Sequence, residues 1–147
     1  MSGPARIFTI GYEGATQAEL IAALTGAGVE RVIDVRAVPL SRKPGFSKNV
    51  LAAGLQEAGI DYVHLKALGT PPAGREAARK GRIAEMRAIY AVQLETPEAE
   101  LAMAQAMADA AEHHAALLCY EREAAGCHRR MLVERMLERA DFEVRDL

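Results

Sequence analysis

The sequence predicts an α/β fold with a mostly parallel sheet, and three observations lead to this prediction. Short apolar runs alternate along the chain with longer stretches whose apolar residues recur at helical spacing. Of the residues, 50% are hydrophobic and 26% are charged, which is typical of a globular protein. The length of 147 residues fits one hydrophobic core, so we expect a single domain over residues 1–147. Together these features favour a Rossmann-like, three-layer arrangement.

The predicted elements follow from local patterns. Thr16 and Glu19 fit a capping box at the start of the first helix. Thr96 and Pro97 suit the cap and the first turn of a later helix. We expect strands at residues 6–11, 29–35, 60–65, 115–119 and 142–145, and helices from about residues 16, 47, 75, 97 and 128, the third of them unbroken to residue 94. We expect the strand order 3-2-1-4-5, with helices on both faces.

Charge is distributed unevenly along the chain. Residues 31–87 hold eleven basic and five acidic side chains, whereas residues 88–118 hold five acidic side chains and no Lys or Arg. One face is therefore expected to attract anions. A nucleic-acid-binding or regulatory module that uses residues 75–87 is the alternative interpretation, although few aromatic side chains lie near this stretch for base stacking.

The sequence also bears on location and partners. No apolar stretch reaches the length of a membrane span, and no long apolar region follows the N-terminus, so we expect a cytoplasmic protein without a membrane partner. The two cysteines, Cys119 and Cys127, are expected to be reduced, because a domain of this size does not need a disulfide. Met103, Met107 and the surrounding alanines suit either close core packing or a homo-oligomer contact.

The ends of the first, second and fourth strands carry most of the reactive side chains. In parallel α/β proteins ligands bind at this edge of the sheet, so the loops after these strands are expected to converge on one site. A helix that begins at His128 would add a positive N-terminal end, which favours a phosphate-bearing or other anionic ligand. The expected ligand-binding residues are Tyr12, Arg36, Arg42, His64, Arg129 and Arg130.

Cysteine chemistry is a second hypothesis for the same loops. The positive field would lower the pKa of a nearby thiol and favour a nucleophilic thiolate. The candidate catalytic residues are therefore Cys119 and Cys127 as nucleophiles, with Glu121 and His128 as acid or base. Whether the chain is an enzyme stays open. No metal site is predicted, because the spacing of the cysteines and histidines does not form close ligand pairs. The sequence does not identify a cofactor.

Two resemblances bear on these hypotheses. The residues Asp34-Val35-Arg36 and Leu117-Leu118-Cys119 are similar to strand ends of rhodanese-like sulfurtransferases and cysteine phosphatases, but Gly126 lies too far from Cys119 for the same anion cradle. A closer resemblance spans almost the whole chain. It is carried by Thr9-Ile10-Gly11-Tyr12, Asp34-Val35-Arg36, Gly59-Ile60-Asp61-Tyr62-Val63-His64, Cys119-Tyr120-Glu121 and Cys127-His128-Arg129. These motifs resemble the family known as domain of unknown function 488, which implies an α/β domain and no particular reaction.

Overall fold

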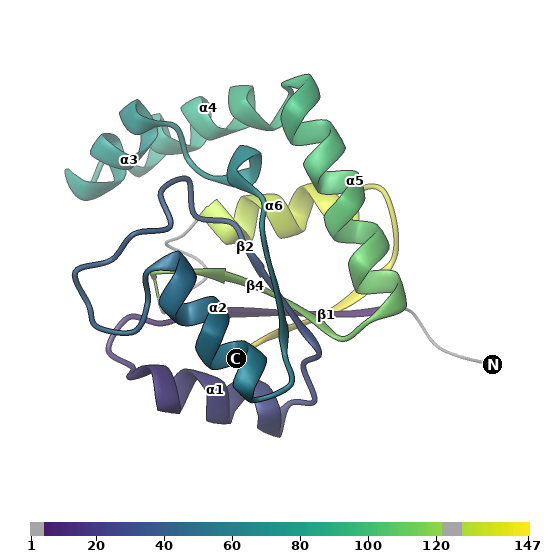
Figure 1. Ribbon diagram of the computed structural model, residues 1–147. Coiled ribbons are helices and arrows are strands. Elements are labelled where there is room, and N and C mark those ends of the chain that lie inside the picture. Colours follow the sequence, from purple (N-terminus) through teal and green to yellow (C-terminus); the bar gives the residue numbers. More distant parts are fainter. Residues whose placement is uncertain (1–4, 122–127) are drawn as a thin grey trace.

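The computed structural model describes residues 5–121 and 128–147, and it confirms the α/β fold. Five strands form one sheet in which every pairing is parallel. Helices cover both faces of the sheet (Figure 1). The strands are β1 (Ala5–Gly11), β2 (Arg31–Asp34), β3 (Asp61–His64), β4 (Ala115–Cys119) and β5 (Phe142–Asp146); the helices are α1 (Gln17–Gly26), α2 (Lys48–Glu57), the 3-10 turn η1 (Lys66–Leu68), α3 (Pro72–Arg79), α4 (Ile83–Leu94), α5 (Pro97–Glu112) and α6 (His128–Leu137).

The strand order is β3-β2-β4-β1-β5, so the predicted order 3-2-1-4-5 is wrong at its centre. β4 lies between β1 and β2 and pairs with both, for example through Leu117 beside Thr9 and Ile33. All five residues of β4 are buried. A strand that is apolar on both faces is most stable in the middle of a sheet covered by helices, which explains the central place of β4.

Two cores lie on opposite faces of this sheet. α1 and α2 bury Leu20, Leu24, Leu51 and Leu55 against one face. α4, α5 and α6 bury their apolar side chains against the other face, together with Ile33 and Leu117. Right-handed crossovers explain this division, because the chain moves toward β3 through α1 and α2 and then returns through the later helices. Figure 1 shows the two layers below and above the sheet.

The carboxyl ends of β1, β2 and β4 lie side by side, as predicted, although their order differs. The backbone amide of Tyr12 donates to the carbonyl of Cys119 at 3.3 Å, and the amide of Val35 donates to the carbonyl of Leu118 at 3.1 Å. The chain leaves β4 toward one face and leaves β1 and β2 toward the other face. Such a divergence opens a crevice at the sheet edge, where ligands bind in this class of fold.

Two helix starts follow the predicted capping patterns. The Thr16 hydroxyl accepts from the amide of Glu19 at 3.1 Å, and the Glu19 carboxylate accepts from the amide of Thr16 at 3.0 Å. At the start of α5, Thr96 accepts from the amide of Ala99 at 3.2 Å and Pro97 takes the first helical position. These contacts satisfy amide groups that have no partner within the helix.

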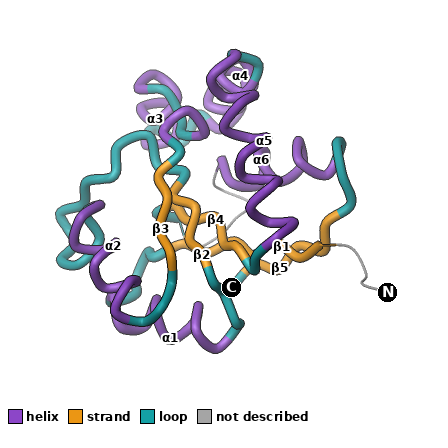
Figure 2. The backbone as a smooth tube through the Cα atoms, turned by 45° about the vertical axis from the view of Figure 1, so that its right-hand side comes forward, coloured by secondary structure: helices purple, strands orange, loops and turns teal. Residues whose placement is uncertain are grey.

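The prediction of one long helix over residues 75–94 is wrong, because α3 and α4 are separate helices (Figure 2). Gly81 lies between them with φ of 77°, a left-handed conformation that ends a helix readily when the residue is glycine. α3 then packs closely on α4 at Gly74. A Cβ atom on Gly74 would lie 2.5 Å from Cγ2 of Thr70 and 3.3 Å from Cγ2 of Ile89. α3 is thus a short helix held over the sheet edge.

Across the described ranges, the helices are too short or too polar to span a lipid bilayer.

Candidate functional site

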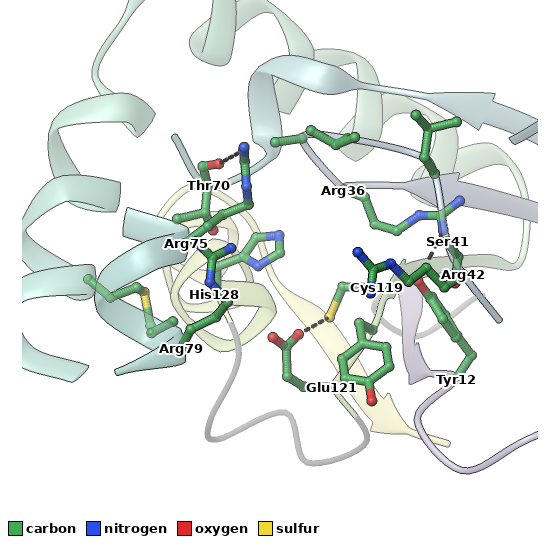
Figure 3. Close-up of a pocket in the computed structure, with 16 residues that line it drawn as sticks. Tyr12, Arg36, Ser41, Arg42, Thr70, Arg75, Arg79, Cys119, Glu121 and His128 are labelled. Carbon is green, nitrogen blue, oxygen red and sulfur yellow. Dashed lines mark hydrogen bonds between the residues drawn. The ribbon is translucent and has the colours of Figure 1, made fainter. Parts of the chain in front are cut away.

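A cavity of about 700 Å³ opens at the carboxyl ends of β1, β2 and β4 (Figure 3). Its walls come from the loop after β2, from α3, and from the segment that follows β4. The polar lining consists of Tyr12, Arg36, Ser41, Arg42, Thr70, Arg75, Arg79, Tyr120, Glu121 and His128, and the apolar lining includes Ala37, Val38, Leu40, Ala78 and Met86. A volume of this size suits a small-molecule ligand.

Arg36 faces the cavity but is held by the protein itself. Its Nε donates to both carboxylate oxygens of Asp34, at 2.9 and 3.1 Å, and its Nη2 donates to Oδ2 at 2.7 Å. Its Nη1 donates to the carbonyl of Phe46 at 2.7 Å and to the Tyr12 hydroxyl at 3.1 Å. Each guanidinium nitrogen therefore has a protein acceptor. Asp34 is fully buried and neutralises the charge of Arg36, which is itself 6% exposed.

Two tyrosines complete this buried network. Tyr62 on β3 donates its hydroxyl hydrogen to Oδ2 of Asp34. Burial raises the pKa of Tyr62, and the hydrogen bond and charge of Asp34 raise it further. Tyr12 stacks on Phe46 with ring centroids 4.4 Å apart. For Arg36, burial alone would lower the pKa, but the hydrogen bond and charge of Asp34 outweigh it and raise the pKa above its ordinary value.

Two histidines form hydrogen bonds with consecutive backbone carbonyls just after the end of β2. Nε2 of His64 lies 2.6 Å from the carbonyl oxygen of Arg36, and Nε2 of His128 lies 3.0 Å from that of Val35. A carbonyl only accepts, so both rings carry a proton on Nε2. Burial lowers the pKa of His128, with a smaller contribution from the charge of Arg129, while the hydrogen bond to the Val35 carbonyl opposes the shift. The resulting pKa is about 4, so this ring is neutral at pH 7. His128 lines the cavity, whereas His64 does not.

Arg129 and Arg130 are neighbours in sequence with different environments. Arg129 is 1% exposed, and its Nη2 donates to the backbone carbonyl of Glu121 at 2.6 Å. Burial lowers the pKa of Arg129, while the charges of Asp146 and Glu121 oppose that effect. Arg130 is exposed and pairs with Glu134 one turn along α6 at 3.5 Å. Neither arginine lines the cavity, and Arg129 instead fixes the backbone that carries Glu121.

Three other arginines line the cavity with fewer internal contacts, and we call Arg42, Arg75 and Arg79 the rim arginines. Arg75 and Arg79 are one turn apart on α3, and Arg42 comes from the loop after β2. Nη1 of Arg75 donates to the carbonyl of Thr70 at 2.9 Å. Over residues 5–121 and 128–147, none of the rim arginines has a carboxylate within ion-pair distance.

Arg75 and Arg79 were missing from the expected site. In the sequence they belong to the basic stretch from residue 75 to residue 87, which supports the nucleic-acid alternative. Their spacing of four residues placed them on one face of a helix, which was the available signal. The direction of that face depends on the break at Gly81 and on the packing of α3, which local patterns did not reveal.

Cys119 lies at the end of β4 and also lines the cavity. Its sulfur is in a disulfide, so the expectation of a reduced thiol at this position is wrong. The sulfur lies 3.5 Å from Oε2 of Glu121 (Figure 3). Cys127 falls outside the described residues. The catalytic roles of Cys119, Cys127, Glu121 and His128 stay predictions, and a nucleophilic Cys119 would first require reduction of its disulfide.

The structure therefore brings Tyr12, Arg36, Arg42, Cys119, Glu121 and His128 to one cavity and places His64, Arg129 and Arg130 outside its lining. His, Cys, Asp and Glu side chains form no group of three or more suited to a metal ion within the described ranges. Among its described residues, the cavity presents guanidinium groups, tyrosine rings and the carboxylate of Glu121.

Comparison with known proteins identifies the family of the chain. Neither a curated protein nor a solved structure matches it. A family model described as "Domain of unknown function DUF488" matches residues 16–136. This range contains the loop after β2, α3 and the segment after β4, which supply most of the cavity wall. Because the match covers far more than half of the sequence, the chain belongs to the family Domain of unknown function DUF488.

Proposed function

We propose that this protein binds a small phosphate-bearing molecule in the cavity, and that the rim arginines hold the phosphate. The observation that carries this proposal is the presence of three guanidinium groups around one cavity without carboxylate partners among the described residues. Guanidinium forks match the oxygens of a phosphate group and donate charge-assisted hydrogen bonds to them.

The arrangement of these arginines supports one anion between two walls. Figure 3 draws Arg75 and Arg79 on one side of the cavity and Arg42 on the other side. Arg75 is oriented by its contact with the Thr70 carbonyl, which leaves further guanidinium hydrogens for a ligand. An anion placed between the walls would gain from both, and the concave site would strengthen these interactions by excluding water.

In this proposal Arg36 stabilises the wall of the ligand site and does not itself hold the phosphate. Its charge is already balanced by Asp34, so it adds little net attraction for a second anion. Its five hydrogen bonds fix Tyr12, Phe46 and the start of the loop that carries Arg42. The rigid base keeps the rim arginines at a set separation, and preorganisation of this kind favours ligand affinity.

The nucleic-acid alternative is less well supported by this arrangement. Two of the cations in residues 75–87 line the cavity, and two others are engaged at the surface. Lys80 pairs with Glu76 at 3.0 Å, and Arg82 pairs with Glu85 at 3.6 Å. A duplex or single strand is best attracted by a continuous positive stripe, which these pairs interrupt.

Calorimetric titration with inorganic phosphate at low ionic strength tests the proposal. The substitutions Arg75→Gln and Arg79→Gln should each weaken binding by about tenfold, because each removes charge-assisted hydrogen bonds. Arg82→Gln is the matched control, since Arg82 is exposed, paired with Glu85 and absent from the cavity wall. Equal losses in all three variants, or no loss in any, would contradict the proposed site. Binding of DNA or RNA that weakens steeply with salt and depends on Arg82 would favour the alternative.

A further inference from the structure

We infer that Glu121 makes the cavity selective for phosphate esters whose organic part carries hydroxyl groups, and against bare inorganic anions. This inference rests on the proposed function and specifies the class of ligand. Among the described residues of the cavity lining, Glu121 is the acidic side chain, opposite in sign to the three rim arginines. It comes two residues after the end of β4, and its carboxylate points into the space drawn in Figure 3.

The position of Glu121 is set by the fold. Arg129, buried in α6, donates to the backbone carbonyl of Glu121 at 2.6 Å and so holds the main chain at this point. The Glu121 side chain contacts the sulfur of Cys119 at 3.5 Å. Arg129 lies outside the cavity lining and Cys119 is part of it, so these contacts hold Glu121 with its carboxylate on the cavity wall.

Opposite charges share the cavity without touching. Within the described ranges, no Arg, Lys or His side chain lies within ion-pair distance of the Glu121 carboxylate. A carboxylate accepts hydrogen bonds and cannot donate them. A ligand that fills the space must therefore present negative oxygens to the rim arginines and hydrogen-bond donors to Glu121. A phosphate ester of a sugar meets both requirements, since two neighbouring hydroxyls match the two carboxylate oxygens.

Inorganic phosphate meets the second requirement poorly. At neutral pH its hydroxyl groups belong to the anion itself, so a hydrogen bond from it to Glu121 brings the charge of the phosphate against the carboxylate. Near Glu121 it places a second negative charge beside the carboxylate, and this repulsion lowers its affinity. The remaining walls suit the body of a larger ligand. Val38 and Leu40 are exposed apolar residues of the lining, and Tyr120 is 48% exposed beside Glu121. A nucleotide would use these surfaces for its base, whereas a sugar phosphate would leave them open.

The test compares inorganic phosphate with ribose 5-phosphate in calorimetric titrations of the full chain. Glu121→Gln should weaken ribose 5-phosphate binding by about tenfold, because charge-assisted hydrogen bonds are lost. The same variant should strengthen inorganic phosphate binding by about threefold, because the repulsion is removed. Glu112→Gln is the matched control: it removes the same charge at the end of α5, just before the start of β4 and away from the cavity.

A second variant separates charge from geometry. Glu121→Asp keeps the negative charge but shortens the side chain, so inorganic phosphate affinity should stay unchanged while ribose 5-phosphate affinity falls. If Glu121→Gln raises the affinity for both ligands equally, Glu121 merely competes with them for the rim arginines and the inference is overturned. It is also overturned if neither affinity changes while Arg75→Gln still weakens binding. Loss of dependence on Arg75 and Arg79 would instead remove the proposed function itself.

Adenosine 5′-monophosphate distinguishes the two sources of such an ester. Tighter binding than ribose 5-phosphate, reduced by Tyr120→Ala, identifies a nucleotide whose base lies on the Tyr120 ring. Equal binding of the two compounds, unaffected by Tyr120→Ala, identifies a sugar phosphate. Both results support selection by Glu121, provided that the opposite responses to Glu121→Gln are observed.

Discussion

Arginines at two depths of the same sheet edge differ in how their hydrogen-bond donors are used. Arg36 and Arg129 are buried, and both donate to protein oxygens that fix the chain around the cavity. The rim arginines lie further out, and the described structure gives none of them an ion pair. Buried charges need partners to be tolerated, whereas exposed ones are solvated. The difference separates residues that build the site from residues suited to hold a ligand.

The largest expected effect comes from breaking the buried pair. Asp34→Ala leaves the Arg36 guanidinium buried without its carboxylate and should lower the free energy of unfolding by about 3–5 kcal/mol. Urea unfolding followed by circular dichroism measures this change. A loss below about 1 kcal/mol, the value typical of a surface pair, would show that Arg36 is not held as described.

A substitution among the rim arginines should have a smaller effect, and the effect should be on ligand affinity more than on the free energy of unfolding. Arg42→Gln should change the free energy of unfolding by no more than about 0.5 kcal/mol, because Arg42 is exposed and has no ion pair among the described residues. The same change should weaken inorganic phosphate binding by about tenfold. Unfolding curves and calorimetry on the same sample give both quantities. A large loss of stability without a change in affinity would place Arg42 with the buried arginines.

The smallest effect at neutral pH is expected for His128. Its pKa of about 4 in the folded protein lies below the ordinary value of 6.5, so the unfolded chain binds a proton more readily between these values. The contribution of His128 to stability is therefore complete above pH 6.5 and is lost as the pH falls toward 4. His128→Gln should flatten this part of the stability curve relative to the wild type in urea unfolding at several pH values. Parallel curves for the two proteins would show that burial does not suppress protonation of His128.

Local patterns predicted most of the fold. β4 has the expected bounds, and Thr16, Thr96 and Pro97 begin their helices as expected. The strand order could not be obtained in this way, because β1 and β4 are both short apolar strands and their order depends on how the whole sheet is covered. The ends of β1, β2 and β4 still converge, since either order makes them neighbours or near neighbours.

The site was harder to predict because the type of a residue does not reveal how deeply its side chain is buried. Arg36 suggested an anion clamp, yet Asp34 precedes it by two residues, so the period of a strand places both side chains on one face. That signal pointed to an internal pair. Arg75 and Arg79 shared a helix face in sequence, but only tertiary packing turns this face toward the cavity. The direction in which an element faces, more than its existence, decides which cations line the cavity.

The break at Gly81 has a consequence for how this protein could diversify. It confines Arg75 and Arg79 to an eight-residue helix that lies between η1 and α4, apart from the strands and the Asp34 network. Substitutions on that helix can change the charge and shape of the cavity rim while the base of the site keeps its stability. Under the proposed function, the residues that hold the ligand and the residues that stabilise the fold therefore lie in separate segments of the chain.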